Sequence, residues 1–215
     1  MAQPQAPYQS QFQPPLFQVE QWTKSFPAKA ATATTTTAAA AADGKEKYVI
    51  STDPSLLSLS ALTDAFNQEY MYWVKPLPAP VLKDMIDRSL CFGVYRCNNS
   101  NDPGDNNQNG TVDASADAAC LTQIGFARLI TDNITFAYLT DVYILPEYQG
   151  TGMGSWLLEC VNAWVDGRGE YFRRLMMVTV GERAERYYQR VMGAETQGRT
   201  GDVLIMGKKG KGAIV

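Results

Sequence analysis

The sequence predicts a single domain of the α/β (α+β) class, in which a mixed β-sheet is flanked by helices on both faces. Three observations support this fold class. Apolar residues make up 45% of the 215-residue chain, which is enough for a sizeable core. Segments of helical and strand character follow each other in the order β-α-α-β-β-β-α-β-α-β. The chain length is typical of one domain with a tail.

The first half of the domain is expected to contain three strands and two helices. Residues 48–52, which are β-branched or aromatic except for Ser51, precede a turn sequence and predict a strand. Apolar residues at helical spacing predict helices over 57–73 and 81–89, separated by prolines. Residues 90–95 and 122–130 again favour strands, and we expect them to pair as a hairpin.

The second half is expected to alternate strands and helices. Residues 136–145 have strong β-propensity, and 155–166 carry an apolar stripe at helical spacing. A strand over 175–180, a helix over 183–192 and a last strand over 203–208 follow.

Two segments differ in composition from the rest of the chain. Residues 1–45 are rich in Gln, Pro, Thr and Ala, and burying them offers little to offset the entropy lost on ordering. We therefore expect a disordered N-terminal arm over 1–45, with loose packing through Trp22 as an alternative, and a folded domain over 46–215. Residues 98–119 are rich in Asn, Asp and Gly, which predicts an inserted surface loop.

Composition excludes several classes of function. The chain has no histidine, which excludes Ser-His-Asp and Cys-His nucleophilic sites and the usual zinc sites. Its net charge of −3 gives no electrostatic basis for binding nucleic acid or an acidic membrane. A run of about 20 apolar residues is missing, and so is a secretory signal. We therefore expect an intracellular, cytoplasmic protein that binds neither nucleic acid nor membranes.

The strongest functional signal is a glycine cluster between a predicted strand and a predicted helix. A helix N-terminus offers about four unpaired backbone N–H groups and the positive end of the helix dipole. Gly150, Gly152 and Gly154 allow the backbone to curl around an anion, for which phosphate or pyrophosphate is the natural ligand. The spacing lacks the lysine of a P-loop and does not match the dinucleotide-binding fingerprint.

The pattern Gln/Arg-x-x-Gly-x-Gly/Ala, which lies at residues 149–154, resembles that of the GNAT superfamily of acetyltransferases. The Tyr-Trp pair at 72–73, the segment 89–95 and Leu-Thr-Asp-Val at 139–142 add to this resemblance, which spans about residues 48–208. It implies a mixed, mostly antiparallel sheet of six to seven strands flanked by helices. It also implies that the sheet is splayed between the fourth and fifth strands.

The resemblance implies acetyl-CoA as the cofactor. The residues whose backbone N–H groups would hold its pyrophosphate are Gln149, Gly150, Thr151, Gly152, Met153 and Gly154. The strand ending in Val142, Tyr143 and Ile144 would pair with the pantetheine arm, and the N–H near Val142 would polarise the acetyl carbonyl.

The resemblance also directs attention to residues for proton transfer and substrate contact. A tyrosine near the end of the helix 183–192 is expected to protonate the leaving thiolate; Tyr188 is favoured, with Tyr187 as the alternative. Asp141 and Glu69 are candidate bases, although Asp141 could equally be a structural carboxylate paired with an arginine. Glu69, Tyr72 and Trp73 lie where substrate contacts are expected, or the two aromatic residues belong to the core.

The inserted loop contains a partial calcium-binding pattern. Its candidate ligands are Asp105, Asn107, Asn109, Thr111 and Asp113. The bidentate glutamate expected at position 12 is replaced by Ala116, which favours an ordinary polar loop over a Ca²⁺ site.

The sequence therefore predicts an acetyl-CoA-dependent N-acetyltransferase in which a primary amine attacks the thioester directly. The alternatives are a transferase acting on protein N-termini or lysines, and a CoA-binding module without catalysis. The sequence does not decide whether the acceptor is a small amine or a peptide. It also does not decide whether the protein forms a homodimer.

Overall fold

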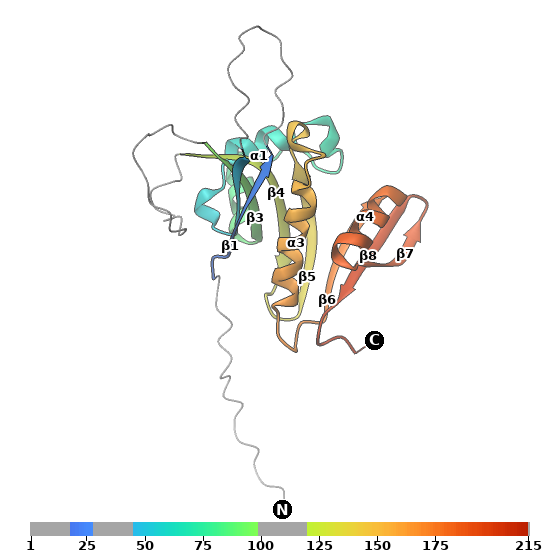
Figure 1. The fold of residues 1–215 in the computed structure, drawn as a ribbon. Coiled ribbons are helices and arrows are strands. Elements are labelled where there is room, and N and C mark those ends of the chain that lie inside the picture. The colour runs from blue at the N-terminus through green and yellow to red at the C-terminus, as the bar shows by residue number, and fades with distance from the viewer. Residues whose placement is uncertain (1–17, 28–44, 99–119, 215) are drawn as a thin grey trace, which may run out of the picture.

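The computed structural model describes residues 18–27, 45–98 and 120–214. Within these residues the chain forms one eight-stranded sheet with the strand order β1-β2-β3-β4-β5-β6-β8-β7 (Figure 1). The strands are β1 (Gln21–Pro27), β2 (Lys45–Ser51), β3 (Leu90–Cys97), β4 (Leu121–Thr131), β5 (Phe136–Ile144), β6 (Arg174–Val180), β7 (Glu195–Thr200) and β8 (Val203–Lys209). Neighbours are antiparallel except β5 and β6, which run parallel.

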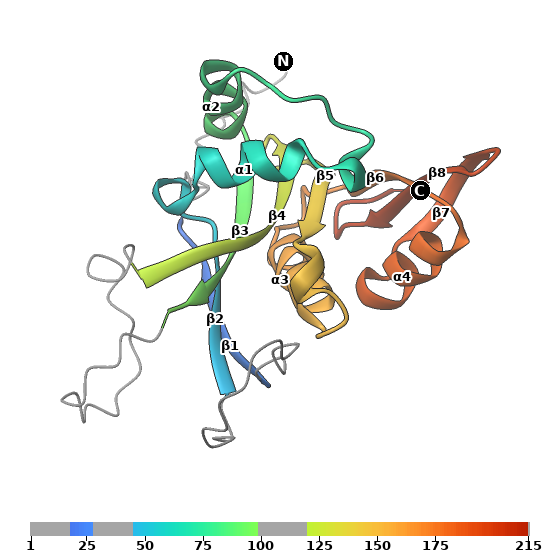
Figure 2. The ribbon, with the colours of Figure 1, turned by 90° about the horizontal axis from the view of Figure 1, so that it is seen from above.

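Helices cover both faces of the sheet, as predicted. The helices are α1 (Leu59–Phe66), α2 (Ala79–Asp87), α3 (Met153–Asp166) and α4 (Glu182–Met192), with short 3₁₀ turns η1 (Pro54–Leu56), η2 (Glu69–Met71) and η4 (Pro146–Tyr148). Figure 2 shows α1 and α2 on one face and α3 and α4 on the other. Each face has its own buried cluster of apolar side chains, the larger beneath α3. The fold class and the layered arrangement are therefore confirmed.

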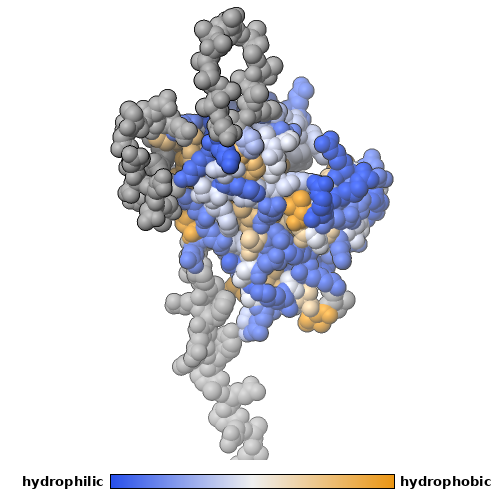
Figure 3. Space-filling model, in the orientation of Figure 1, coloured by the Kyte–Doolittle hydropathy of each residue, from blue (hydrophilic) through white to orange (hydrophobic). Residues whose placement is uncertain are grey.

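The outer surface of the C-terminal half is strongly hydrophilic. Figure 3 shows this over α4 and β7, where α4 exposes Glu182, Arg183, Arg186 and Arg190. None of the described helices is long and apolar enough to cross a lipid bilayer.

The predicted helix over 57–73 is shorter in the structure. The Ser58 hydroxyl accepts a hydrogen bond from the Ala61 N–H and caps α1 at its start. The helix ends at Phe66, and the chain continues into η2. After this break Tyr72 is exposed.

The prediction of a disordered arm over 1–45 is wrong for residues 21–27. These residues form β1, which pairs with β2 at the edge of the sheet. Trp22 stacks on Phe92 at 5.9 Å, and buried Phe26 contacts Trp156 at 5.6 Å between ring centroids. Two aromatic side chains thus give this short segment enough buried surface to order it.

The eighth strand, β7, was also not expected from the sequence. Its residues are polar and mostly exposed, because β7 is an edge strand that pairs only with β8 among the described strands. The sheet consequently exceeds the six to seven strands that the resemblance implied.

Candidate active site

The site lies where β5 and β6 separate. Their parallel register extends from Phe136↔Arg174 to Leu139↔Met177 and ends there. Beyond this point β6 continues to pair with β8 up to Val180, while β5 remains paired with β4. Figure 1 shows the two strands together at their N-terminal ends and apart at their C-terminal ends. Because β1 was not predicted, the fourth and fifth expected strands are β5 and β6. The predicted splay between them is therefore confirmed.

A β-bulge interrupts β5 beside the point of separation. Thr140 pairs with Arg128 and Tyr143 with Phe126, so Asp141 and Val142 together stand opposite Ala127. Asp141 has a φ of 53°, a left-handed conformation that is uncommon for a residue other than glycine. The bulge thus takes the Asp141–Val142 backbone out of the regular ladder at the place where the acetyl group is expected.

An ion pair holds the bulge. Arg128 Nε donates to Asp141 Oδ2 at 2.7 Å, and the side chains are only 12% and 6% exposed. Arg128 Nη1 also donates to Ser89 Oγ at 3.1 Å, and Thr140 donates to the second carboxylate oxygen at 3.2 Å. The sequence leaves two roles open for Asp141, a catalytic base or a structural carboxylate paired with an arginine. The ion pair with Arg128 is the contact that the structural role requires.

The glycine cluster forms an open helix N-terminus. Gly150 and Gly152 have φ of 80° and 93°, which only glycine adopts without strain. Gly152 is the N-cap of α3 and supplies no side-chain cap, and the first hydrogen bond of the helix runs from the Trp156 N–H to the Gly152 carbonyl. The N–H groups of the first helical turn therefore point outward without an intrahelical acceptor.

Side chains of the loop are used to hold its shape. Gln149 Nε2 donates to the Ile144 carbonyl at 2.8 Å, and Thr151 Oγ1 donates to the Tyr148 carbonyl at 2.7 Å. The Gln149 N–H, which was predicted to bind the pyrophosphate, donates instead to the Pro146 carbonyl at 3.2 Å. The backbone N–H groups of residues 150–154 are thus the part of the loop that remains for a ligand. An uncapped helix N-terminus with glycines at positive φ fits the pyrophosphate of CoA.

The two candidate tyrosines occupy different places on α4. Tyr187 lies over the start of α3: its hydroxyl accepts a hydrogen bond from Ser155 Oγ at 3.5 Å, and a Cβ added to Gly154 would come within 2.9 Å of it. Tyr188 is half-buried against the main apolar cluster. Burial, with a smaller contribution from Tyr187, raises the pKa of Tyr188 to about 12.

The predicted substrate-contacting residues lie on the α1 face. Glu69 belongs to η2, and Tyr72 and Trp73 follow it with their rings packed edge to face at 4.9 Å. Tyr72 is 71% exposed and Trp73 47%, so neither belongs to the core. This leaves their predicted contact with substrate as the interpretation to be tested.

The remaining prediction concerns a metal site, and the buried cysteines are described with it. The candidate calcium ligands, residues 105–113, lie outside the described residues, and within the described part of the chain no group of three or more acidic or cysteine residues could hold a metal. Cys91 and Cys160 are buried thiols, and desolvation raises the pKa of each to about 12. They are therefore not nucleophiles at neutral pH.

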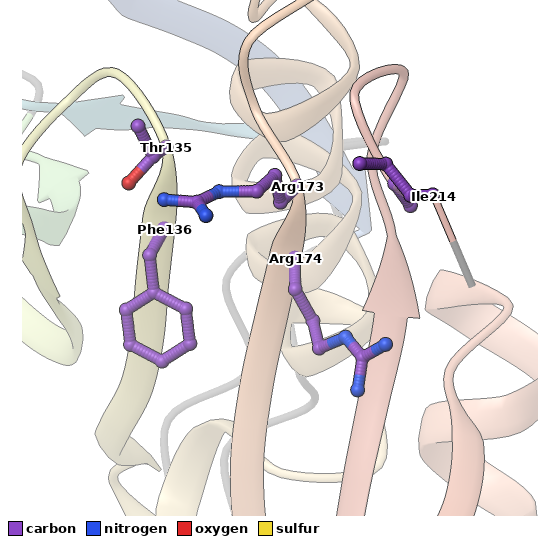
Figure 4. A pocket seen from close by; sticks show the side chains of 6 residues that line it. Thr135, Phe136, Arg173, Arg174 and Ile214 are labelled. Atoms are coloured by element: carbon purple, nitrogen blue, oxygen red, sulfur yellow. The ribbon is translucent and has the colours of Figure 1, made fainter.

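A cavity of about 450 Å³ lies at the other end of β5 and β6. Figure 4 shows Arg173 reaching from the start of β6 towards Thr135, with Ile214 on the opposite side. Because the strands are paired here, this cavity is separate from the point where they diverge.

Sequence reasoning missed several residues around the site. No sequence pattern pointed to Arg128 or Ser155, because their roles depend on the residues that the sheet and α4 bring beside them. Phe26 was missed because it lies in the compositionally biased arm, yet its ring lies 3.7 Å from the position of a Cβ on Gly152.

Comparisons with known proteins agree with this geometry. The sequence profile of the Acetyltransferase (GNAT) domain matches residues 116–191. A Gibberella zeae protein named as a proposed acetyltransferase is 42% identical over 132 residues, which cover 61% of this chain and 71% of the relative.

Solved structures are also among the matches. A Xanthomonas campestris protein described as belonging to the GNAT family is 30% identical, with 66% of this chain and 82% of that chain covered and a TM-score of 0.47. A GNAT acetyltransferase from Streptococcus pneumoniae has 16% identity, 75% and 99% coverage and a TM-score of 0.51, and it shows the same fold. On the strength of the matched profile and the fungal relative, the chain belongs to the GNAT family of acetyltransferases.

Proposed function

We propose that the chain transfers an acetyl group from acetyl-CoA to a primary amine without an acyl-enzyme. The observation that carries this proposal is the uncapped, glycine-rich start of α3 directly after the strand that separates from β6. In this arrangement residues 150–154 hold the pyrophosphate through backbone N–H groups, and Val142–Ile144 align the pantetheine arm.

The cofactor supplies an activated acetyl group as a thioester. In this proposal the Val142 N–H, which lies in the bulge, polarises the acetyl carbonyl. Arg128 and Asp141 act as positioning residues that hold the bulge.

Proton transfer then falls to Tyr188 and solvent. A neutral amine forms the new C–N bond as the C–S bond breaks, and the nitrogen releases its extra proton to water. The departing sulfur takes a proton from Tyr188, which then regains a proton from water. A phenol whose pKa is raised to about 12 stays protonated at neutral pH and therefore has a proton to give.

The test measures CoA thiol release from acetyl-CoA with a panel of primary amines and peptides. We expect release with amines, and acetyl-CoA should raise the melting temperature by mass action. Gly152→Asp should abolish both effects, because a carboxylate repels the pyrophosphate. Gly152→Asn carries the same backbone strain without the charge and should retain part of the binding.

Gly169→Asp is the matched control. Gly169 is exposed and open space surrounds it. The same change of charge there should therefore alter neither the CoA release nor the rise in melting temperature with acetyl-CoA. Unchanged binding in Gly152→Asp would contradict the cofactor site. Acetyl-CoA binding without transfer to any amine or peptide would contradict the enzymatic function.

A further inference from the structure

A second cavity, of about 380 Å³, lies on the α1 face of the sheet. It is bounded by α1, by the ends of β4 and β5 and by η4. Figure 2 shows α1 on the face of the sheet opposite α3, so the cavity and the glycine cradle lie on different sides of β5. The polar residues that line it are Asp64, Gln68, Tyr70, Gln123, Tyr143 and Glu147.

The bulge in β5 places Tyr143 in this cavity. Before the bulge Ala137 and Leu139 belong to the cluster beneath α3, and after it Ile144 does. The extra residue therefore reverses the alternation, and Tyr143 packs in the cluster beneath α1. Without the bulge the Tyr143 ring would face α3.

The floor of the cavity is polar and its geometry is fixed. The Ser58 N–H donates to Gln123 Oε1 at 2.9 Å, which orients the amide so that Nε2 faces the Tyr143 hydroxyl at 3.5 Å. The hydroxyl of Tyr70 is buried and has no hydrogen-bond partner in the described structure. Buried hydroxyls without partners are rare in proteins, and a bound ligand would supply the missing bond.

The rim of the cavity is acidic. Asp64 on α1 and Glu147 on η4 are exposed, and no lysine or arginine lines the cavity. The remaining lining, with Ala61 and Leu145 as examples, is apolar and accommodates methylene groups. Two carboxylates, phenol oxygens and an apolar wall together fit an alkylammonium group.

We propose that this cavity binds the second, unreacting ammonium group of the acceptor, which is then an aliphatic diamine or a longer polyamine. This inference rests on the proposed amine acetylation. Tyr143 and Leu145 follow Val142 by one and three residues, which places the cavity about 3–10 Å along β5 from the acetyl position. A short alkyl chain between two amino groups covers this distance.

The test compares 1,4-diaminobutane with butylamine as acceptors at saturating acetyl-CoA. The wild-type protein should show a higher kcat/KM for the diamine. In Asp64→Asn/Glu147→Gln this preference should fall by about threefold to tenfold, the effect of two exposed charge interactions. The kcat/KM for butylamine should not change, because its single amino group sits at the acetyl position.

Two further variants separate binding from folding. Tyr70→Phe should raise KM for the diamine while leaving the melting temperature unchanged, since the hydroxyl has no partner to lose. Asp84→Asn/Glu170→Gln removes the same charge from exposed sites away from the cavity and should keep the preference.

The outcomes distinguish the two proposals. Equal kcat/KM for both amines in the wild type, or a diamine preference that survives in Asp64→Asn/Glu147→Gln, would overturn the cavity assignment and leave amine acetylation standing. Absence of transfer to either amine and to every other amine would overturn both.

Discussion

At the scale of single residues, Tyr188 and Tyr187 are neighbours for which we propose separate tasks. Desolvation raises the pKa of both phenols, and that of Tyr188 reaches about 12. Tyr187 contacts the start of α3 through a hydrogen bond with Ser155. We therefore attribute proton donation to Tyr188 and support of the cofactor loop to Tyr187.

Replacing Tyr188 by Phe keeps the ring and removes the proton. We expect kcat to fall by roughly 10²-fold, the low end of what a general acid supplies, with acetyl-CoA affinity unchanged. Tyr187→Phe should instead weaken acetyl-CoA binding with a smaller effect on kcat. Steady-state kinetics and calorimetry would separate these effects, and full activity in the double variant would make solvent the proton source.

The residue scale also shows where sequence reasoning stops. The position of Asp141 beside the acetyl slot could be predicted from the resemblance, and so could the glycines at 150–154. The ion pair with Arg128 could not, because it depends on the register of β4 against β5 and on the bulge between them.

At the scale of elements, β1 links the N-terminal segment to the cofactor loop. Phe26 is buried against Tyr48 and Trp156, and its ring approaches Gly152. Residues 18–27 thus form part of the domain rather than of an arm.

Phe26→Ala should lower the free energy of unfolding by about 3–5 kcal/mol, the usual cost of truncating a buried phenylalanine. It should also weaken acetyl-CoA binding, because the loop at Gly152 loses its support. Denaturant unfolding and calorimetry would measure the two effects. Ser25→Ala, an exposed position on the same strand, is the control, and equal stability of the two variants would show that β1 does not dock.

Elements with apolar alternation or helical spacing were predictable, and the two edge strands were not. The sequence Glu-Thr-Gln-Gly-Arg-Thr of β7 has no apolar alternation, because most of its side chains face solvent and the pairing with β8 supplies its order. β1 has only two large aromatic side chains and lies next to compositionally biased segments. Both β1 and β7 are ordered by backbone pairing with a neighbouring strand, and the periodicity of a sequence gives no information on such pairing.

At the scale of the whole molecule, the absence of histidine sets the pH dependence. We expect kcat/KM to rise from pH 6 to 10 as the acceptor ammonium, whose pKa is near 10.4, loses its proton. No inflection should appear near pH 6.5. Since the pKa of Tyr188 is raised to about 12, the acid form persists across this range and the rate should not fall again.

This profile is measured with an alkylamine at subsaturating concentration, because the second ammonium group of a diamine would titrate in the same pH range. A bell-shaped curve that declines below pH 9 would require a more acidic proton donor than Tyr188. The same curve in Tyr188→Phe should keep its rising limb, because that limb belongs to the substrate.

The extra residue in β5 has a consequence for anyone who redesigns this protein. The strand consists of two pieces of opposite phase joined at Asp141, so no single alternating template describes it. Shortening it by one residue would exchange the faces of Tyr143 and Ile144 while leaving the composition almost untouched. Transplanting the strand into another scaffold therefore requires the bulge, Arg128 and Asp141 to move together as one unit.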